Sequence, residues 1–101
     1  RDRKSRTTHT HRRLGGQIKR ALELALGAAS DVSLHGVWIV RCEPDPDASR
    51  FRVVIRPEDE DDTVLDRLEA ARSWLRMEVA HAIHRKRVPD LRFVRAPEES
   101  T

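Results

Sequence analysis

Residues 85–94 read Arg-Lys-Arg-Val-Pro-Asp-Leu-Arg-Phe-Val, a basic segment that passes through a proline into alternating apolar and polar residues. Proline cannot continue a helix, so the basic residues before it are typical of a helix end. Leu91 and Phe93 fall on one face of the segment that follows, because side chains alternate between the two faces of a strand. The stretch therefore predicts a junction between a helix and a strand, with Arg92 and Arg95 as the strand's charged residues.

A helical pattern precedes this junction and runs from Thr63 to Lys86. It opens with Thr63-Val64-Leu65-Asp66, which has the form of a capping box, and its apolar stripe contains Leu65, Leu68, Leu75, Val79 and Ala82. A straight helix of this length would measure about 36 Å, whereas a chain of this size has a radius of gyration of about 13 Å. The helix would overhang the domain, and Arg72 would fall inside the apolar stripe. A break near Ala71-Arg72-Ser73 resolves both conflicts; the alternative is an unbroken helix in which Arg72 extends along the apolar surface to reach water.

Two strands are expected before that helix. Residues 37–43, Val-Trp-Ile-Val-Arg-Cys-Glu, are largely β-branched and aromatic, and they stop at a turn, Pro44-Asp45-Pro46-Asp47. Residues 50–56 alternate between a core face and a wet, basic face. The core face holds Phe51, Val53 and Ile55, and the other face holds Arg50, Arg52, Val54 and Arg56. The loop between the strands is short, so an antiparallel hairpin is the simplest connection.

A first helix is indicated by the apolar stripe Leu14, Ile18, Ala21, Leu22, Ala25 and Ala29, and it should end between Gly27 and Ser30. Gly15 and Gly16 each cost a helix about 1 kcal/mol relative to Ala. Either the helix begins at Gln17, or something approaches its first turn closely; we favour the later start. Residues 1–10 contain no aliphatic side chain and no Phe, Trp or Tyr, so they predict a disordered basic arm.

Composition limits the classes of protein to which the chain can belong. Its 101 residues fit one compact domain, expected at residues 11–96 between the arm and a short tail at 97–101. Apolar residues make up 38% and charged residues 37%, which allows one modest core and a charged surface. No apolar run is long enough to cross a membrane and no secretory signal opens the chain, so a cytoplasmic protein is expected. Cys42 is the only cysteine, which excludes an internal disulfide and suggests a reduced, buried thiol.

Charge is distributed unevenly along the sequence. The net charge is only +3, but the first twenty residues hold eight basic side chains against one acid, Asp2. Residues 58–62 are all acidic. Such asymmetry suggests a polyanionic partner for one face, with the acidic run kept away from it; the simpler interpretation is a solvated tail and a solvated loop. The lack of a heptad pattern favours a monomer.

The predicted elements follow the order helix, strand, strand, helix, helix, strand. A right-handed crossover would return the last strand parallel to the second, and the helices would cover one face of the sheet. This is a two-layer α+β fold. The order, with the break between its second and third helices, resembles that of ribosome-binding factor A, a family with the type II KH fold.

The resemblance covers roughly residues 12–94. The segment from Arg12-Arg13 through Gln17-Ile18-Lys19-Arg20 is similar to the family's opening helix, and Glu43-Pro44-Asp45-Pro46-Asp47 falls at its turn between the first two strands. Arg87-Val88-Pro89-Asp90-Leu91-Arg92-Phe93 is similar to the family's Arg-x-Pro-x-Leu-x-Phe signature, the most specific of these motifs. At the break, Ala71-Arg72-Ser73 stands where family members carry Ala-x-Gly. Ala96 and Glu98 stand where the family tends to continue with Asp and Ser.

The resemblance implies a factor that binds the immature small ribosomal subunit, contacts its ribosomal RNA and assists late maturation. Independently of the family, lysines and arginines along a helix and an arm can neutralise phosphates, and a helix break can offer backbone N–H groups to an anion. The candidate RNA-binding residues are Lys4, Arg6, Arg12, Arg13, Lys19, Arg20, Arg72, Ser73, Arg76, Arg85, Lys86 and Arg87. Their alternative role is a solvated helix face, with cations complementing the dipole of a helix C-terminus.

Other signals favour neither a metal site nor catalysis. His81 and His84 could share one helix face, but no carboxylate with suitable spacing is evident, so no metal and no cofactor are expected. No nucleophile–base pair or phosphate loop can be recognised, so no enzyme activity is expected. Phe51 and Phe93 should point inward, which argues against an aromatic RNA-binding platform, and Trp74 should fill the angle between two helices or be partly exposed. The competing hypotheses are a protein-interaction or ligand-sensing α+β module and a nonspecific nucleic-acid binder.

Overall fold

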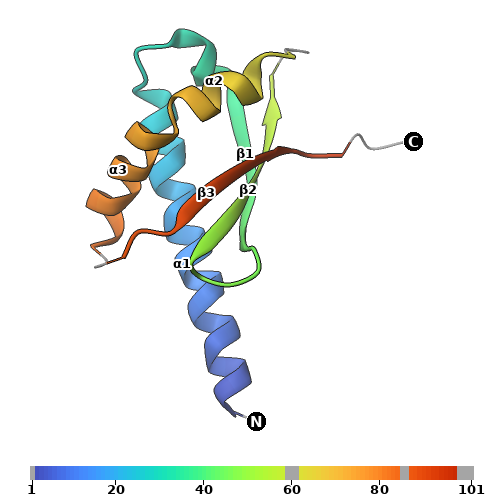
Figure 1. Ribbon diagram of the computed structural model, residues 1–101, viewed down its shortest axis with the longest axis vertical. Coiled ribbons are helices and arrows are strands. Elements are labelled where there is room, and N and C mark those ends of the chain that lie inside the picture. Colours follow the sequence, from blue (N-terminus) through green and yellow to red (C-terminus); the bar gives the residue numbers. More distant parts are fainter. Residues whose placement is uncertain (1, 59–61, 85–86, 98–101) are drawn as a thin grey trace.

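The chain forms a three-stranded sheet that is covered on one side by helices (Figure 1). The computed structural model describes residues 2–58, 62–84 and 87–97, with side chains from Arg12 onward. In chain order, the elements are α1 (Asp2–Gly27), the short 3₁₀ helix η1 (Val32–Gly36), β1 (Val37–Pro44), β2 (Arg50–Pro57), α2 (Val64–Ala70), α3 (Arg72–Ile83) and β3 (Asp90–Arg95). The predicted order and the α+β class are confirmed, and η1 is an addition that the sequence pattern missed.

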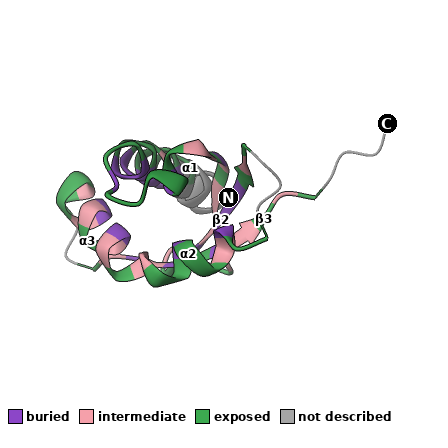
Figure 2. Cartoon of the chain, turned by 90° about the horizontal axis from the view of Figure 1, so that it is seen from above, coloured by how far each residue is buried: buried purple, intermediate pink, exposed green. Residues whose placement is uncertain are grey.

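The sheet has the order β1-β2-β3. β1 and β2 form the expected antiparallel hairpin, and β3 returns parallel to β2. Figure 2 shows α1, α2 and α3 on one side of the strands. Phe51, Val53 and Ile55 are fully buried beneath the helices, as their alternation predicted. The opposite face of β2 is less exposed to solvent than expected. Val54 is only 2% exposed, because it lies between Arg41 of β1 and Val94 of β3 in the register.

α1 begins at Asp2, so the predicted start at Gln17 is wrong. The helix runs through Gly15 and Gly16, and the alternative explanation, a close approach, is correct for Gly15. A Cβ placed on Gly15 would lie 2.6 Å from the carbonyl oxygen of Cys42 in β1, whereas one on Gly16 would meet nothing within 4 Å. Residues 2–10, for which composition predicts a disordered arm, form the first turns of α1 in the structure.

The second helical segment breaks where its length and pattern required. α2 ends at Ala70 and α3 begins at Arg72; between them, Ala71 has φ −92° and ψ 1°. The capping box is absent at the described N-terminus of α2, where the Thr63 side chain makes no capping hydrogen bond. Its hydroxyl oxygen instead accepts a hydrogen bond from Nε of Arg67 at 3.0 Å. The sequence typical of a capping box therefore does not produce one here.

η1 joins the end of α1 to β1 through side-chain hydrogen bonds. Asp31 accepts hydrogen bonds from the backbone N–H of Ser33 at 3.0 Å and from its hydroxyl at 2.6 Å. These bonds, together with the nearby Arg67, lower the pKa of Asp31. Arg67 also donates to Asp31 at 3.4 Å and to Ser33 at 3.1 Å, which connects η1 to α2. Nε2 of His35 lies 2.8 Å from the carbonyl oxygen of Ala29, and this contact connects η1 to the end of α1.

Candidate nucleic-acid interface

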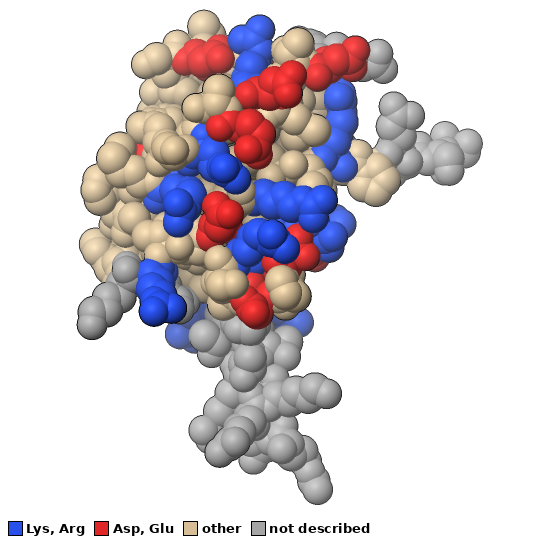
Figure 3. All heavy atoms as spheres, viewed as in Figure 1, with Lys and Arg blue, Asp and Glu red and all other residues tan. Residues whose placement is uncertain are grey.

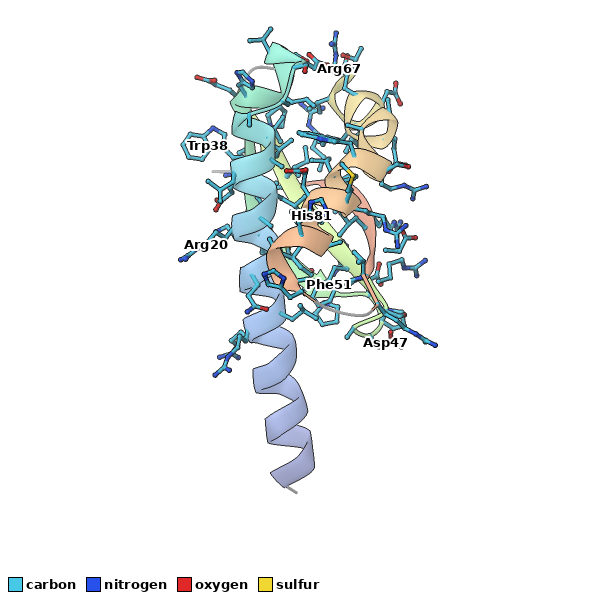
Figure 4. The ribbon with its side chains drawn as sticks, turned by 90° about the vertical axis from the view of Figure 1, so that its left-hand side faces the viewer. Arg20, Trp38, Asp47, Phe51, Arg67 and His81 are labelled. Atoms are coloured by element: carbon cyan, nitrogen blue, oxygen red, sulfur yellow. The ribbon has the colours of Figure 1, made fainter. Side chains whose placement is uncertain are left out.

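The exposed side of α1 carries basic residues in two lines. Arg12 and Lys19 are seven residues apart and share one line, and Arg13 and Arg20 share the other, because seven residues make nearly two helical turns. Arg12, Arg13 and Arg20 are exposed, and Lys19 is half-buried beside β1. Figure 4 shows Arg20 pointing away from α3, the helix that carries His81. Lys4 and Arg6 belong to α1, but their side chains lie outside the described part of the chain.

Arg13 and Arg20 are two of the predicted residues that are placed to meet a phosphate. Neither forms an ion pair with another side chain in the described ranges, so their charges are not already neutralised there. The apolar residues on the opposite side of α1, Leu14, Ile18 and Leu22, are buried and hold the helix against the core. The fold thus presents a rigid line of positive charge to solvent.

The arginines at the helix break, Arg72 and Arg76, contact other groups of the protein. Nε of Arg72 lies 3.7 Å from the carboxylate of Glu69, and its Nη1 lies 3.9 Å from that of Asp90. Arg76 donates from Nη2 to the carbonyl oxygen of Val88 at 3.2 Å, and its Nε lies 3.8 Å from Asp90. These contacts connect α3 to the start of β3. Arg76 therefore has a structural role that the sequence did not indicate.

The remaining described residues of the predicted set lie at opposite ends of α3. Ser73 is exposed on the first turn of α3, and Arg87 is exposed just before β3. Arg85 and Lys86 lie outside the described residues. Figure 3 shows the face over α2, α3 and β3, where basic and acidic side chains are interspersed. The structure therefore divides the predicted set between α1 and the helix break, and does not bring it into a single basic patch.

The uncovered face of the sheet holds residues that the sequence analysis did not select. We call this the open sheet face; it comprises Trp38, Arg41 and Glu43 of β1, Arg52, Val54 and Arg56 of β2, and Arg92 and Val94 of β3. Trp38 is 64% exposed. Its position could have been inferred from strand alternation, because it precedes Ile39, which points into the core. Figure 4 shows that Trp38 projects away from the body of the molecule.

A hollow of about 300 Å³ lies beside the helix break. Its lining comprises Ala29, Ser30, Asp31, Leu34, Ala71 and Trp74. Trp74 is half-buried and packs against the core, so it fills space between the break and the end of α1 while leaving part of its surface at the hollow. The expected partial exposure of Trp74 is confirmed, and its neighbours at the hollow come from the end of α1, from η1 and from the break.

The histidines and the cysteine raise the possibility of a metal site and of a reactive thiol. Within the described ranges, no group of three or more His, Cys, Asp or Glu side chains is placed to hold a metal ion. Cys42 is half-buried against the core, and burial raises the pKa of its thiol to about 12. No helix of the described part combines the length and the apolar character that crossing a membrane would require.

Comparison of the sequence with known families gives a match over most of the chain. The model of the family described as Ribosome-binding factor A matches residues 10–99. A curated relative from Rhodospirillum rubrum, also described as ribosome-binding factor A, is 40% identical over 99 residues. The match covers 89% of this chain and 58% of the relative, so the chain spans little more than half of that protein's length.

Solved structures resemble the fold as a whole. The crystal structure of ribosome-binding factor A from Thermus thermophilus has a TM-score of 0.76 and 26% identity, and the match covers 84% of this chain and 94% of that chain. A Thermus thermophilus homology model fitted into a cryo-electron-microscopy map of a complex with the 30S subunit has a TM-score of 0.69 and 26% identity, covering 79% of this chain and 88% of that one. The solution structure of a Thermotoga maritima protein, 21% identical with a TM-score of 0.72 over 87% of this chain and 89% of that chain, supports the fold alone. The KH-like fold class is confirmed.

Proposed function

The chain belongs to the ribosome-binding factor A family, and on this premise we propose that it binds the immature small ribosomal subunit, contacts its ribosomal RNA and assists late maturation. A protein described as ribosome binding factor A has been fitted into a map of a 30S complex, which supports this choice of partner. In this proposal the chain acts by binding, as a cytoplasmic monomer that needs neither a cofactor nor catalytic residues.

The observation that carries the proposal is the exposed basic side of α1. Arg13 and Arg20 lie on one line of a helix whose other side is fixed to the core, and each guanidinium is free of ion pairs within the described ranges. Basic side chains that neutralise phosphates release counterions, so binding through them weakens as salt rises. Arg12 and Lys19 extend the same surface toward β1.

The helix break is the second surface that we propose for RNA binding. Arg72, Ser73 and Arg76 lie on the first turns of α3 and Arg87 lies just before β3, and the side chains of Arg72 and Arg76 remain about two-fifths exposed. The exposed part of each side chain can still contact a phosphate while the contacts within the protein remain. Reversing their charge would disturb the junction as well as any RNA contact, so α1 offers the cleaner test.

The experiment compares two double variants in co-sedimentation with purified small subunits. Arg13→Glu with Arg20→Glu should weaken binding by tenfold or more and reduce the slope of log affinity against log salt by about two, one for each phosphate that is no longer neutralised. Arg13→Lys with Arg20→Lys keeps the charges and should retain most of the binding. Equal binding by the wild type and both variants at every salt concentration would contradict a role for this surface.

A further inference from the structure

We propose that the open sheet face is a second RNA-binding surface, which takes a single-stranded segment with one base stacked on Trp38 and its phosphates beside Arg56 and Arg41. This goes beyond the proposed function, which uses α1 and the helix break. The surface is on the uncovered face of the sheet, whereas the helices occupy the other face (Figure 2).

The register places an aromatic ring beside a cation. Trp38 of β1 lies directly opposite Arg56 of β2. Side chains of directly opposed residues in adjacent strands point to the same face, so the indole and the guanidinium are neighbours on the open sheet face. Farther along, Val54 lies between Arg41 and Val94 and is only 2% exposed, so the accessible part of this face is made by the side chains around it. The arrangement provides a flat aromatic ring and positive charge within one surface.

The charge that is not neutralised lies near Trp38. Arg52 is paired with Glu43 through two hydrogen bonds, of 3.1 Å from Nε and 2.5 Å from Nη2, and this pairing lowers the pKa of Glu43. At the same end of the face, Arg92 lies 3.4 Å from the carboxylate of Asp45. Arg56 is exposed and has no acidic partner among the described residues.

Arg41 completes the basic group on β1. Its Nε lies 3.5 Å from Oε2 of Glu43, whereas both hydrogen bonds from Arg52 go to Oε1. One carboxylate therefore serves two guanidinium groups, and one positive charge is left over. The side chain of Arg41 is 53% exposed. The end of the face that carries Trp38 and Arg56 is therefore positive, whereas the end near the hairpin turn is balanced.

Single-stranded RNA fits these features better than an acidic polypeptide does. An exposed indole costs free energy in water, and a nucleobase covers its flat surface while leaving the phosphates within reach of the flanking arginines. An acidic segment would pair with the arginines but would leave the ring uncovered. Phe51 and Phe93 are buried, as predicted, so Trp38 is the aromatic residue that the described strands present on this face.

The test measures binding of a fluorescein-labelled oligoadenylate decamer to the full chain by anisotropy across a salt series. Trp38→Leu should lower the affinity about tenfold, because base–aromatic stacking contributes on that order. Arg56→Gln should weaken binding and reduce the salt slope by about one. The matched control is Val32→Ala, which removes another exposed apolar side chain, 73% exposed, from η1.

A second readout uses the protein's own fluorescence. Trp38 and Trp74 are the two tryptophans, so Trp74→Phe leaves Trp38 as the only indole. Stacking should quench its emission in a saturable way. An unchanged affinity for Trp38→Leu would overturn the proposal, and so would quenching by polyglutamate but not by the decamer. If small subunits bind through Arg13 and Arg20 while the decamer leaves Trp38 unquenched, the sheet-face proposal alone fails.

Discussion

Gly15 lies where α1 crosses β1, and the lack of a side chain allows the helix to approach the backbone of Cys42. Because an added Cβ would lie 2.6 Å from that carbonyl oxygen, Gly15→Ala requires the helix or the strand to move. We expect it to lower the free energy of unfolding by about 1 to 3 kcal/mol, as overpacking does. Urea denaturation followed by circular dichroism measures the change.

Gly16 provides the matched control because the same substitution has room there. A Cβ on Gly16 would meet nothing within 4 Å, so Gly16→Ala should raise the free energy of unfolding by up to about 1 kcal/mol through helix propensity. Opposite signs at adjacent positions are the expected result. A stabilising effect at both positions would show that the contact with Cys42 is looser than described.

The thiol of Cys42 should be inert in the folded protein. Burial raises its pKa to about 12, so very little thiolate exists at pH 8. Reaction with a thiol-specific disulfide reagent should be slow in the native state and rapid in concentrated urea, with absorbance as the readout. Rapid labelling of the native protein would contradict the burial of this side chain.

At the residue scale, the sequence alone could not decide where α1 begins. The Gly15-Gly16 pair indicates either a late helix start or a close approach, and local propensity favours the first, which is wrong. The deciding partner is a carbonyl in β1, far along the chain, and no local pattern reports such a contact. The buried stripe of α1, by contrast, follows from the helical period and was predicted correctly, with Leu26 as an addition.

At the element scale, Arg76 connects α3 to the beginning of β3. Removing its hydrogen bond to the carbonyl of Val88 and its contact with Asp90 should destabilise the junction. We expect Arg76→Gln to lower the free energy of unfolding by about 1 kcal/mol, a modest loss because the side chain is 42% exposed and water screens its charge. Thermal unfolding measures it.

Ser73→Ala is the control for that substitution, since Ser73 lies on the same helix and is exposed. It should change the free energy of unfolding by less than about 0.5 kcal/mol. If Arg76→Gln proved as neutral as Ser73→Ala, the arginine would be free for another role and its assignment to the junction would be wrong.

Elements were predictable where they were long and periodic. The break between α2 and α3 followed from an excessive helix length and from Arg72 inside the apolar stripe. η1 was missed because a single 3₁₀ turn has no period to detect. Its local signal is Asp31 two residues before Ser33, the spacing of a side chain that bonds a nearby backbone N–H. The expected cap is missing because Thr63 has helical backbone angles, φ −95° and ψ −1°, in place of the extended angles of an N-cap residue, and its hydroxyl instead accepts a hydrogen bond from Arg67.

At the scale of the whole molecule, the distribution of charge depends on which side chains pair in three dimensions. The sequence placed the arginines of α1 and of the helix break in one candidate set. The fold separates them and pairs Arg72 and Arg76 with Asp90, a partner brought near only when β3 returns beside β2. For the same reason, the basic surface around Trp38 becomes visible only when three strands are in register.

The most direct test of the proposed function is co-sedimentation of the purified chain with immature small subunits, mature small subunits and large subunits across a salt series. We predict binding that prefers the immature small subunit and weakens steeply as salt rises, because phosphate contacts release counterions. Absent binding, or equal binding to all three particles, would contradict the proposed function and favour an interaction module or a nonspecific nucleic-acid binder.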